Sequence, residues 1–250
     1  MFRDHYPALA LSYAVALSGW LLLNRAVPSL WPLAPSIELP RGWREFGWAM
    51  LGAAGVIAIG QLWSRGIRLP ESSSLLGAVN QLLIFAPILL VPAWRRHAPD
   101  TAWLPRPRLA LRLSAGLALS VVAIAAYSWA RHGSAPPWLL LARIWQPGHV
   151  DELVQVLCED VAIAIVFVRL ASAIGSRGAT IAVACLFAAG HIPAMLSSGA
   201  SWPETAGLLR DAALGTAVIL VLQRSRDVTW FWLVHFSMDM LQFDRVSGAS

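Results

Sequence analysis

The chain has 250 residues, of which 57% are hydrophobic and only 13% charged, and its mean hydropathy is +0.60. Soluble domains carry about 25% charged residues, so the composition excludes an ordinary soluble domain and indicates an integral membrane protein. The net charge of +5 is the balance of 19 basic residues, all of them Arg, and 14 acidic residues. They stand singly or in small groups between apolar runs, which is typical of membrane topology signals and predicts no nucleic-acid partner.

Apolar runs of membrane-spanning length follow one another along the chain, separated by segments rich in Pro, Gly, Ser and Arg. A transmembrane helix needs about 20 mostly apolar residues. The first run has no convincing cleavage site after it, so we expect a retained anchor rather than a signal peptide. The pattern predicts an all-α, polytopic membrane protein, a single domain over 1–250 with about eight transmembrane helices in one bundle, at 8–24, 46–63, 75–94, 110–130, 150–174, 179–196, 206–222 and 228–243.

The distribution of Arg predicts an orientation. If eight helices cross the membrane, alternate connecting segments lie on the same side, and twelve of the 19 Arg residues fall on one side. By the positive-inside rule that side is cytoplasmic, which leaves both termini outside.

Four ionisable side chains lie at a similar depth in three of the last four predicted spans. Glu159 is about nine residues, or roughly 14 Å, beyond the start of its span. His191, His235 and Asp239 lie about five, eight and four residues from the ends of spans that run the opposite way. An ionisable residue inside a membrane is a functional-site hypothesis by default. Because successive spans run in opposite directions, these four side chains come to a similar depth in the membrane.

Helical spacing refines this cluster. His235 and Asp239 are four residues apart and share a helix face. Asp160 points about 100° away from Glu159, so the two carboxylates need not serve one role. A Glu beside a His can take a proton from a water molecule that attacks a carbonyl, and a second His can donate to the oxyanion that forms. A lone membrane His more often joins two helices by a hydrogen bond, so the prediction of a hydrolytic site depends on all of these residues converging.

Three short motifs occur in order in the last spans: Glu159-Asp160, Phe187-x-x-x-His191 and His235-x-x-x-Asp239. They resemble the motifs of the CPBP family of intramembrane glutamic proteases, which includes the CAAX prenyl endopeptidases. That family carries EExxxR, FxxxH and HxxxN or HxxxD on separate helices of an eight-helix membrane fold. The resemblance covers about residues 150–243, and the first four spans are similar to the family only in being hydrophobic.

The resemblance implies a function and a role for each matched residue. Glu159 would activate the water, His191 would help to position it, and His235 with Asp239 would stabilise the oxyanion, with Asp160 as the fifth residue of the site. The implied substrate is a membrane-embedded or lipid-anchored protein. The implied setting is the lipid bilayer of a bacterial inner or plasma membrane, where the enzyme would process or sort exported proteins.

The chain departs from the family pattern at two positions. Asp160 replaces a Glu, and Ala164 replaces the motif Arg. Arg169 is not a substitute, because ten residues of helix extend about 15 Å. We therefore expect Asp160 to be protonated or satisfied by another group, such as Arg210 or Arg143.

Two alternatives to the protease remain open. An inactive family member that binds or escorts a membrane protein would agree with the missing Arg. A proton-coupled transporter would also carry buried Glu, Asp and His. No cofactor is expected, although Glu159, His191, His235 and Asp239 offer ligands suited to Zn²⁺, without the compact HExxH spacing of many zinc proteases.

Overall fold

A computed structural model describes residues 6–32, 37–70, 72–105, 107–133, 137–197 and 199–246. Every regular element in these ranges is helical, as the composition predicts, and they contain no strand. The elements are α1 (Tyr6–Ala26), α2 (Gly42–Ser64), α3 (Ser74–Trp94), η2 (Pro99–Ala102), α4 (Leu109–His132), α5 (Pro137–Ile144), η3 (Pro147–His149), α6 (Val150–Ile174), α7 (Ser176–Gly190), α8 (Ile192–Ser197), α9 (Trp202–Ala206), α10 (Leu208–Ser225) and α11 (Val228–Val246).

Four of the described helices, α1 to α4, are long and apolar enough to cross a membrane. They are the helices of a multi-pass membrane protein. The expected number of eight is wrong by this measure. Helix α7 has only 15 residues, fewer than the roughly 20 that a bilayer requires. Helices α10 and α11 carry three charged residues each and α6 carries five, which makes them more polar than a lipid-exposed span.

The helix boundaries agree with the predicted runs except near the sixth one. The predicted span at 179–196 is broken, because α7 ends at Gly190 and the short α8 begins at Ile192. Proline has no backbone N–H and its ring clashes with the carbonyl four residues earlier in a continuous helix, and Pro193 is the second residue of α8. As a result, His191 caps the end of α7 instead of lying inside a continuous helix.

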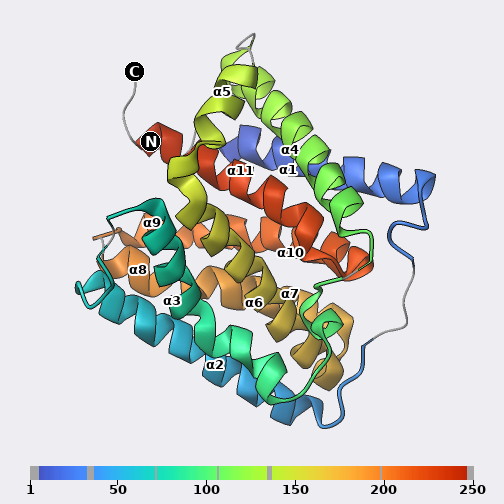
Figure 1. Ribbon diagram of the computed structural model, residues 1–250, viewed down its shortest axis with the longest axis vertical. Coiled ribbons are helices and arrows are strands. Elements are labelled where there is room, and N and C mark those ends of the chain that lie inside the picture. The colour runs from blue at the N-terminus through green and yellow to red at the C-terminus, as the bar shows by residue number, and fades with distance from the viewer. Residues whose placement is uncertain are drawn as a thin grey trace.

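Helix α6 lies at the centre of the molecule. It packs against α2 and α3 on one side, against α11 on another, and against α7 (Figure 1). Helices α1 and α4 pack together, and α4 also packs against α11. The side chains of α6 are accordingly buried from Val156 to Leu170 at most positions, including Ala164 and Ile165, which are fully enclosed. This position explains how α6 can hold charged residues away from lipid.

Glycine allows two of these helix contacts to be very close. A Cβ atom on Gly116 of α4 would lie 2.4 Å from the carbonyl oxygen of Trp230 of α11, and one on Gly42 would lie 2.4 Å from that of Ser172 of α6. Small residues at helix interfaces let backbones approach in this way in membrane proteins, where close packing replaces the hydrophobic effect as the main attraction between helices. The α4–α11 contact fixes the helix that carries His235.

A buried ion pair anchors the start of α11. Asp227, which is fully enclosed, accepts hydrogen bonds from Arg112 (2.8 Å), from the indole of Trp31 (2.7 Å) and from the backbone N–H of Thr229 (2.8 Å). The last of these is the usual bond between an N-terminal capping residue and the first turn of a helix.

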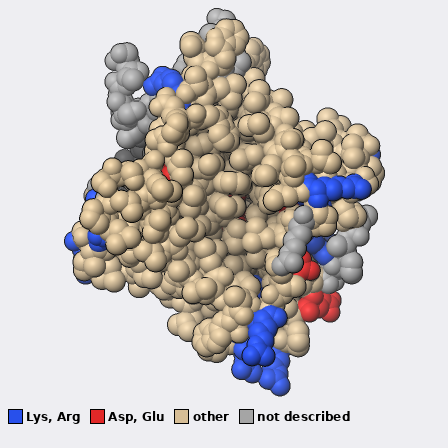
Figure 2. All heavy atoms as spheres, in the orientation of Figure 1, with Lys and Arg blue, Asp and Glu red and all other residues tan. Residues whose placement is uncertain are grey.

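The outer surface is apolar. Large hydrophobic side chains such as Leu51, Leu82, Leu90 and Leu111 are more than 40% exposed. Figure 2 shows a face with very few charged side chains, and the Arg side chains that are visible lie near its margins. A surface of this kind suits contact with lipid.

Candidate functional site

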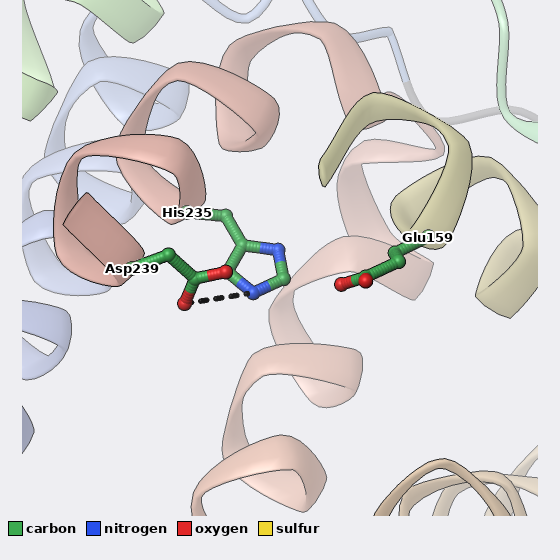
Figure 3. A group of neighbouring side chains, drawn as sticks. All are labelled: Glu159, His235 and Asp239. Carbon is green, nitrogen blue, oxygen red and sulfur yellow. Dashed lines mark ion pairs between the residues drawn. The ribbon is translucent and has the colours of Figure 1, made fainter. Parts of the chain in front are cut away.

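Helices α6 and α11 bring four of the predicted site residues together. Glu159, His235 and Asp239 each offer a ligand atom, and these atoms all lie within 4.8 Å of one another. Figure 3 shows the carboxylate of Glu159 directed toward the ring of His235 from the opposite helix, with Asp239 on the other side of the ring. Asp160 completes the group from α6. Residues 75 or more positions apart in the sequence therefore form one polar cluster.

His235 lies between two aspartates. Its Nδ1 is 2.9 Å from Oδ1 of Asp160, and its Nε2 is 3.7 Å from Oδ1 of Asp239. The first distance is a hydrogen bond, in which Nδ1–H donates to the carboxylate, whereas the second is too long to be one. Asp160 is fully enclosed, and its other oxygen has no hydrogen-bond partner among the described residues. The partner of Asp160 is thus His235, where the sequence analysis expected a protonated side chain or another group such as Arg210 or Arg143.

The bond from Asp160 determines which ring atom of His235 is available. With Nδ1–H committed to Asp160, Nε2 is the nitrogen that faces Asp239. The two adjacent carboxylates of α6 therefore meet the same imidazole in different ways, in keeping with the angle of about 100° between them. Asp160 orients the imidazole, and Glu159 faces the same ring from the open side of the cluster.

Gln155 holds the carboxylate of Glu159. The Nε2 of Gln155 donates to Oε1 of Glu159 at 2.9 Å, one helical turn earlier on α6. Sequence reasoning missed this residue, although the spacing of four positions was a sufficient signal. The bond leaves the second oxygen of Glu159 for a water molecule or another partner.

Glu159 also lines an apolar cavity of about 390 Å³ between α2, α3, α6 and α7. The walls include Met50 and Ile57 of α2 and Phe85 of α3. Among the lining residues, Glu159 and His191 are the two with polar side chains. The cavity thus offers a hydrophobic space with a carboxylate and an imidazole on its wall.

His191 lies apart from the main cluster. It is exposed at the end of α7, and its Nδ1–H donates to the carbonyl oxygen of Phe187 at 3.0 Å. Its ring also meets that of Phe187 edge-on, with 4.8 Å between centroids. The two residues of the FxxxH motif therefore interact with each other, and His191 shares the cavity with Glu159 without belonging to the close group around His235.

Aromatic rings enclose the other side of His235. The ring of Phe231 lies 5.4 Å from that of His235, and the ring of Tyr13 of α1 lies 6.5 Å away. Tyr13 is buried, and no motif identified it. Two further hydrogen bonds hold α11 in place against its neighbours. Ser237 pairs with Ser120 of α4 at 2.6 Å, and Trp232 donates to the carbonyl of Leu153 of α6 at 2.7 Å.

The position of the motif Arg is occupied by Ala164, which is fully enclosed. Arg169 points elsewhere, since its guanidinium donates to the carbonyls of Thr101 (3.3 Å) and Ile165 (3.0 Å) and approaches Nδ1 of His97 at 3.2 Å. Within the described residues, the hydrogen-bond partners of Glu159 and Asp160 are Gln155 and His235, and neither is an arginine.

Comparison with known proteins gives no match. No family model, no curated protein and no solved structure matches the chain. The resemblance to CPBP proteases therefore depends on the motif residues alone, and a function has to be argued from the geometry of the cluster and its cavity.

Proposed function

We propose that the chain is an intramembrane endopeptidase that uses water, activated at Glu159, to hydrolyse a peptide bond of a membrane-associated protein. The observation that carries the proposal is the convergence of Glu159, His235 and Asp239 within 4.8 Å, together with the apolar cavity that Glu159 lines. Hydrolysis needs a proton acceptor, a group that meets the oxyanion, and a space for the substrate. The cluster supplies the first two and the cavity supplies the third.

The reaction would proceed by addition and elimination. The free oxygen of Glu159 takes a proton from water while the water oxygen bonds to the carbonyl carbon, and the carbonyl oxygen becomes an oxyanion. The oxyanion is stabilised on the side of Asp239 by Nε2–H of His235, which donates when the imidazole carries a proton on both nitrogens. Collapse breaks the C–N bond, and the proton held by Glu159 passes to the departing amine. One water is consumed, and a carboxylate and an amine are formed.

Helix α6 would form the centre of the membrane domain. In this proposal its residues Asp160 and Arg169 are buried away from lipid, in a helix that packs against α2, α3 and α11. The enzyme would lie in a bacterial inner or plasma membrane and process or sort exported proteins. The apolar walls of the cavity favour a hydrophobic segment of the substrate, from a membrane-embedded or lipid-anchored protein.

A second candidate function is supported by Ala164. A family member that lacks the motif Arg and keeps the cavity could bind or escort a membrane protein without cutting it. This candidate predicts the same occupancy of the cavity and no dependence on the Glu159 carboxylate.

The test compares the membrane proteins of cells that express the wild-type chain, Glu159→Gln or Glu152→Gln. Glu152 lies seven residues before Glu159 on the same helix and serves as the matched control. We expect intact-mass measurement to show a shortened protein with the wild type and with Glu152→Gln, and only its full-length form with Glu159→Gln. Cleavage by Glu159→Gln would overturn the proposal.

Two other outcomes separate the alternatives. An escort protein would produce no cleavage product in any strain, and Glu159→Gln would support its cellular role fully. A transporter would produce pH-dependent uptake of solute in liposomes, also without a peptide product.

A further inference from the structure

Two arginines hold left-handed backbone positions where α2 begins and α3 ends. Arg41 precedes α2 with a φ of 61°, and Arg96 follows α3 with a φ of 56°. The N–H of Arg96 donates to the carbonyl of Ala93 and the N–H of His97 to that of Pro92, which is a Schellman helix end. Glycine is the usual residue at this position, because the left-handed conformation crowds a Cβ atom. An arginine in its place costs backbone energy, so its side chain is the feature to explain.

The start of α2 and the end of α3 lie side by side. The guanidinium of Arg95 donates to the carboxylate of Glu45 at 2.7 Å, which joins the two helix ends. Arg96 and Arg44 are the sequence neighbours of this pair, and with Arg41 they form what we call the basic corner. All three are exposed, and within the described part of the chain no ion pair joins them to an acidic side chain. Figure 2 shows basic side chains at the lower edge of the molecule, where α2 begins in Figure 1.

Exposed tryptophans and leucines continue from the basic corner along α2 and α3. Trp43 and Trp94 are 63% and 67% exposed, and Leu51 and Leu90, further along the same two helices, are 62% and 61% exposed. Tryptophan is enriched at the level of lipid headgroups, and leucine suits the hydrocarbon below them. The surface therefore presents charge, then indole rings, then aliphatic side chains. This is the order of polarity along a phospholipid, from its phosphate to its acyl chains.

We propose that the basic corner binds the phosphate of an anionic phospholipid, whose acyl chains lie along α2 and α3. The proposal goes beyond the hydrolytic function and uses none of its residues. A guanidinium pairs with a phosphate through two parallel hydrogen bonds, which favours arginine for this task. The distribution of Arg also predicts that this end of the bundle faces the cytoplasm, and the cytoplasmic leaflet carries anionic lipids.

The experiment measures lipid binding to the full-length chain in detergent by native mass spectrometry. Phosphatidylglycerol is the anionic probe, phosphatidylcholine is the neutral one, and the wild type should prefer the first about tenfold or more. Each Arg near an anionic surface contributes roughly fivefold in affinity, so Arg41→Gly combined with Arg96→Gly should weaken phosphatidylglycerol binding about 25-fold. Phosphatidylcholine binding should not change.

The matched control removes the same charge at the opposite end of the bundle. Arg65 follows α2 and Arg131 lies in the last turn of α4. Arg65→Gln combined with Arg131→Gln should keep the phosphatidylglycerol affinity of the wild type.

The glycine substitutions separate lipid binding from folding. Arg96→Gly relieves the left-handed backbone, so its thermal unfolding midpoint in lipid-free detergent should equal or exceed that of the wild type. Arg44→Gln is a third variant, in the exposed first turn of α2, and should lose roughly fivefold in phosphatidylglycerol affinity. If the double glycine variant does not fold, Arg44→Gln alone decides.

Three results would overturn the basic corner as a lipid site. The first is equal binding of both lipids by the wild type. The second is an equal loss of phosphatidylglycerol affinity in the corner and control variants, which would indicate general charge attraction. The third is displacement of the lipid by a millimolar excess of inorganic phosphate, which would indicate a site for the free anion. Weakened lipid binding in the corner variants alone supports the proposal, whether or not the chain cleaves a peptide.

Discussion

Helix α6 contributes to two histidine–carboxylate clusters, one near its middle and one near its C-terminal end, and the two clusters differ in whether a ligand can reach them. At the first, Glu159 and Asp160 meet His235. At the second, about 15 Å further along the helix, Arg169 meets His97, with Glu45 nearby. Both combine buried acidic and basic groups inside an apolar protein, so burial of charge alone does not distinguish a functional site from a structural one.

The two clusters differ in their hydrogen-bond partners and in whether a ligand can reach them. Arg169 donates to two backbone carbonyls and approaches His97, and Glu45 accepts three hydrogen-bond contacts from Arg95, the shortest 2.7 Å. These contacts tie the start of α2, the segment after α3 and the end of α6 together. At the other cluster the Nε2 of His235 has no hydrogen bond within the described residues, and Glu159 borders a cavity. Among the described residues the Nε of Arg169 is also without a partner, so the distinguishing feature of the candidate site is the space beside Glu159 that a ligand can enter.

The sharpest test of this comparison replaces one carboxylate in each cluster, Glu159 in the first and Glu45 in the second. Glu159→Gln should lower kcat/KM for the cleaved protein by about 10²–10⁴-fold, because it removes the proton acceptor. Its folding should be unchanged, since the amide oxygen of Gln can still accept from Gln155. Glu45→Gln should lower the free energy of unfolding and leave kcat/KM per folded molecule nearly unchanged. Cleavage kinetics and denaturant unfolding are measured on both variants, and equal kcat/KM losses in the two would contradict the distinction.

Arg169→Met should show the structural role of the second cluster most directly. The substitution leaves the carbonyl of Thr101 without its buried donor, which should destabilise the protein by about 1–3 kcal/mol. Met is similar in length and should fill the space. Unfolding in nanodiscs or mild detergent measures the change. A stable Arg169→Met protein that has lost cleavage would place Arg169 in the functional machinery instead.

The sequence predicts the helices well and the side-chain partners poorly. Apolar runs bounded by Pro, Gly and Arg give most helix ends to within a few residues, because these residues act locally. The break after α7 was missed even though Pro193 signals it, since the apolar run continues through "IPAML".

The hydrogen bond between Asp160 and His235 was missed for a different reason. It joins residues 75 positions apart, and it depends on the rotation of α6 against α11, which no local pattern reports. The same limit applies to Tyr13, whose ring approaches His235 from α1. By contrast, the bond between Gln155 and Glu159 follows from spacing within a single helix.

Asp160→Asn should have a smaller effect than Glu159→Gln, and it tests whether Asp160 orients the imidazole of His235. Asp160→Asn keeps the shape of the enclosed side chain but weakens its hold on Nδ1 of His235. We expect kcat/KM to fall about 10–100-fold, because the imidazole loses the carboxylate that orients it, with little change in stability. The pH profile of cleavage should also shift, which a purely structural role would not cause. Unaltered kcat/KM together with an unaltered pH profile would show that Asp160 does not position His235.

The smallest expected effect concerns pH and the second cluster. His97 lies in the segment between α3 and η2, and its Nδ1 must be unprotonated to accept from Arg169. Burial first, and then the positive charges of Arg169 and Arg95, hold the pKa of His97 below its ordinary value of 6.5, while Glu45 acts in the opposite direction. The unfolded chain therefore binds this proton at a higher pH than the folded chain does.

The sign of the stability change follows from that difference. Stability from His97 is fully present above pH 6.5 and declines as the pH falls below it, because the unfolded state gains a proton that the folded state resists. His97→Gln keeps an oxygen that can accept from Arg169 and does not titrate, so its unfolding free energy should decline less steeply between pH 7 and pH 5 than that of the wild type. Subtracting the two curves removes the contribution of other titrating groups, including His235. Parallel curves would mean that the Arg169–His97 contact is not maintained.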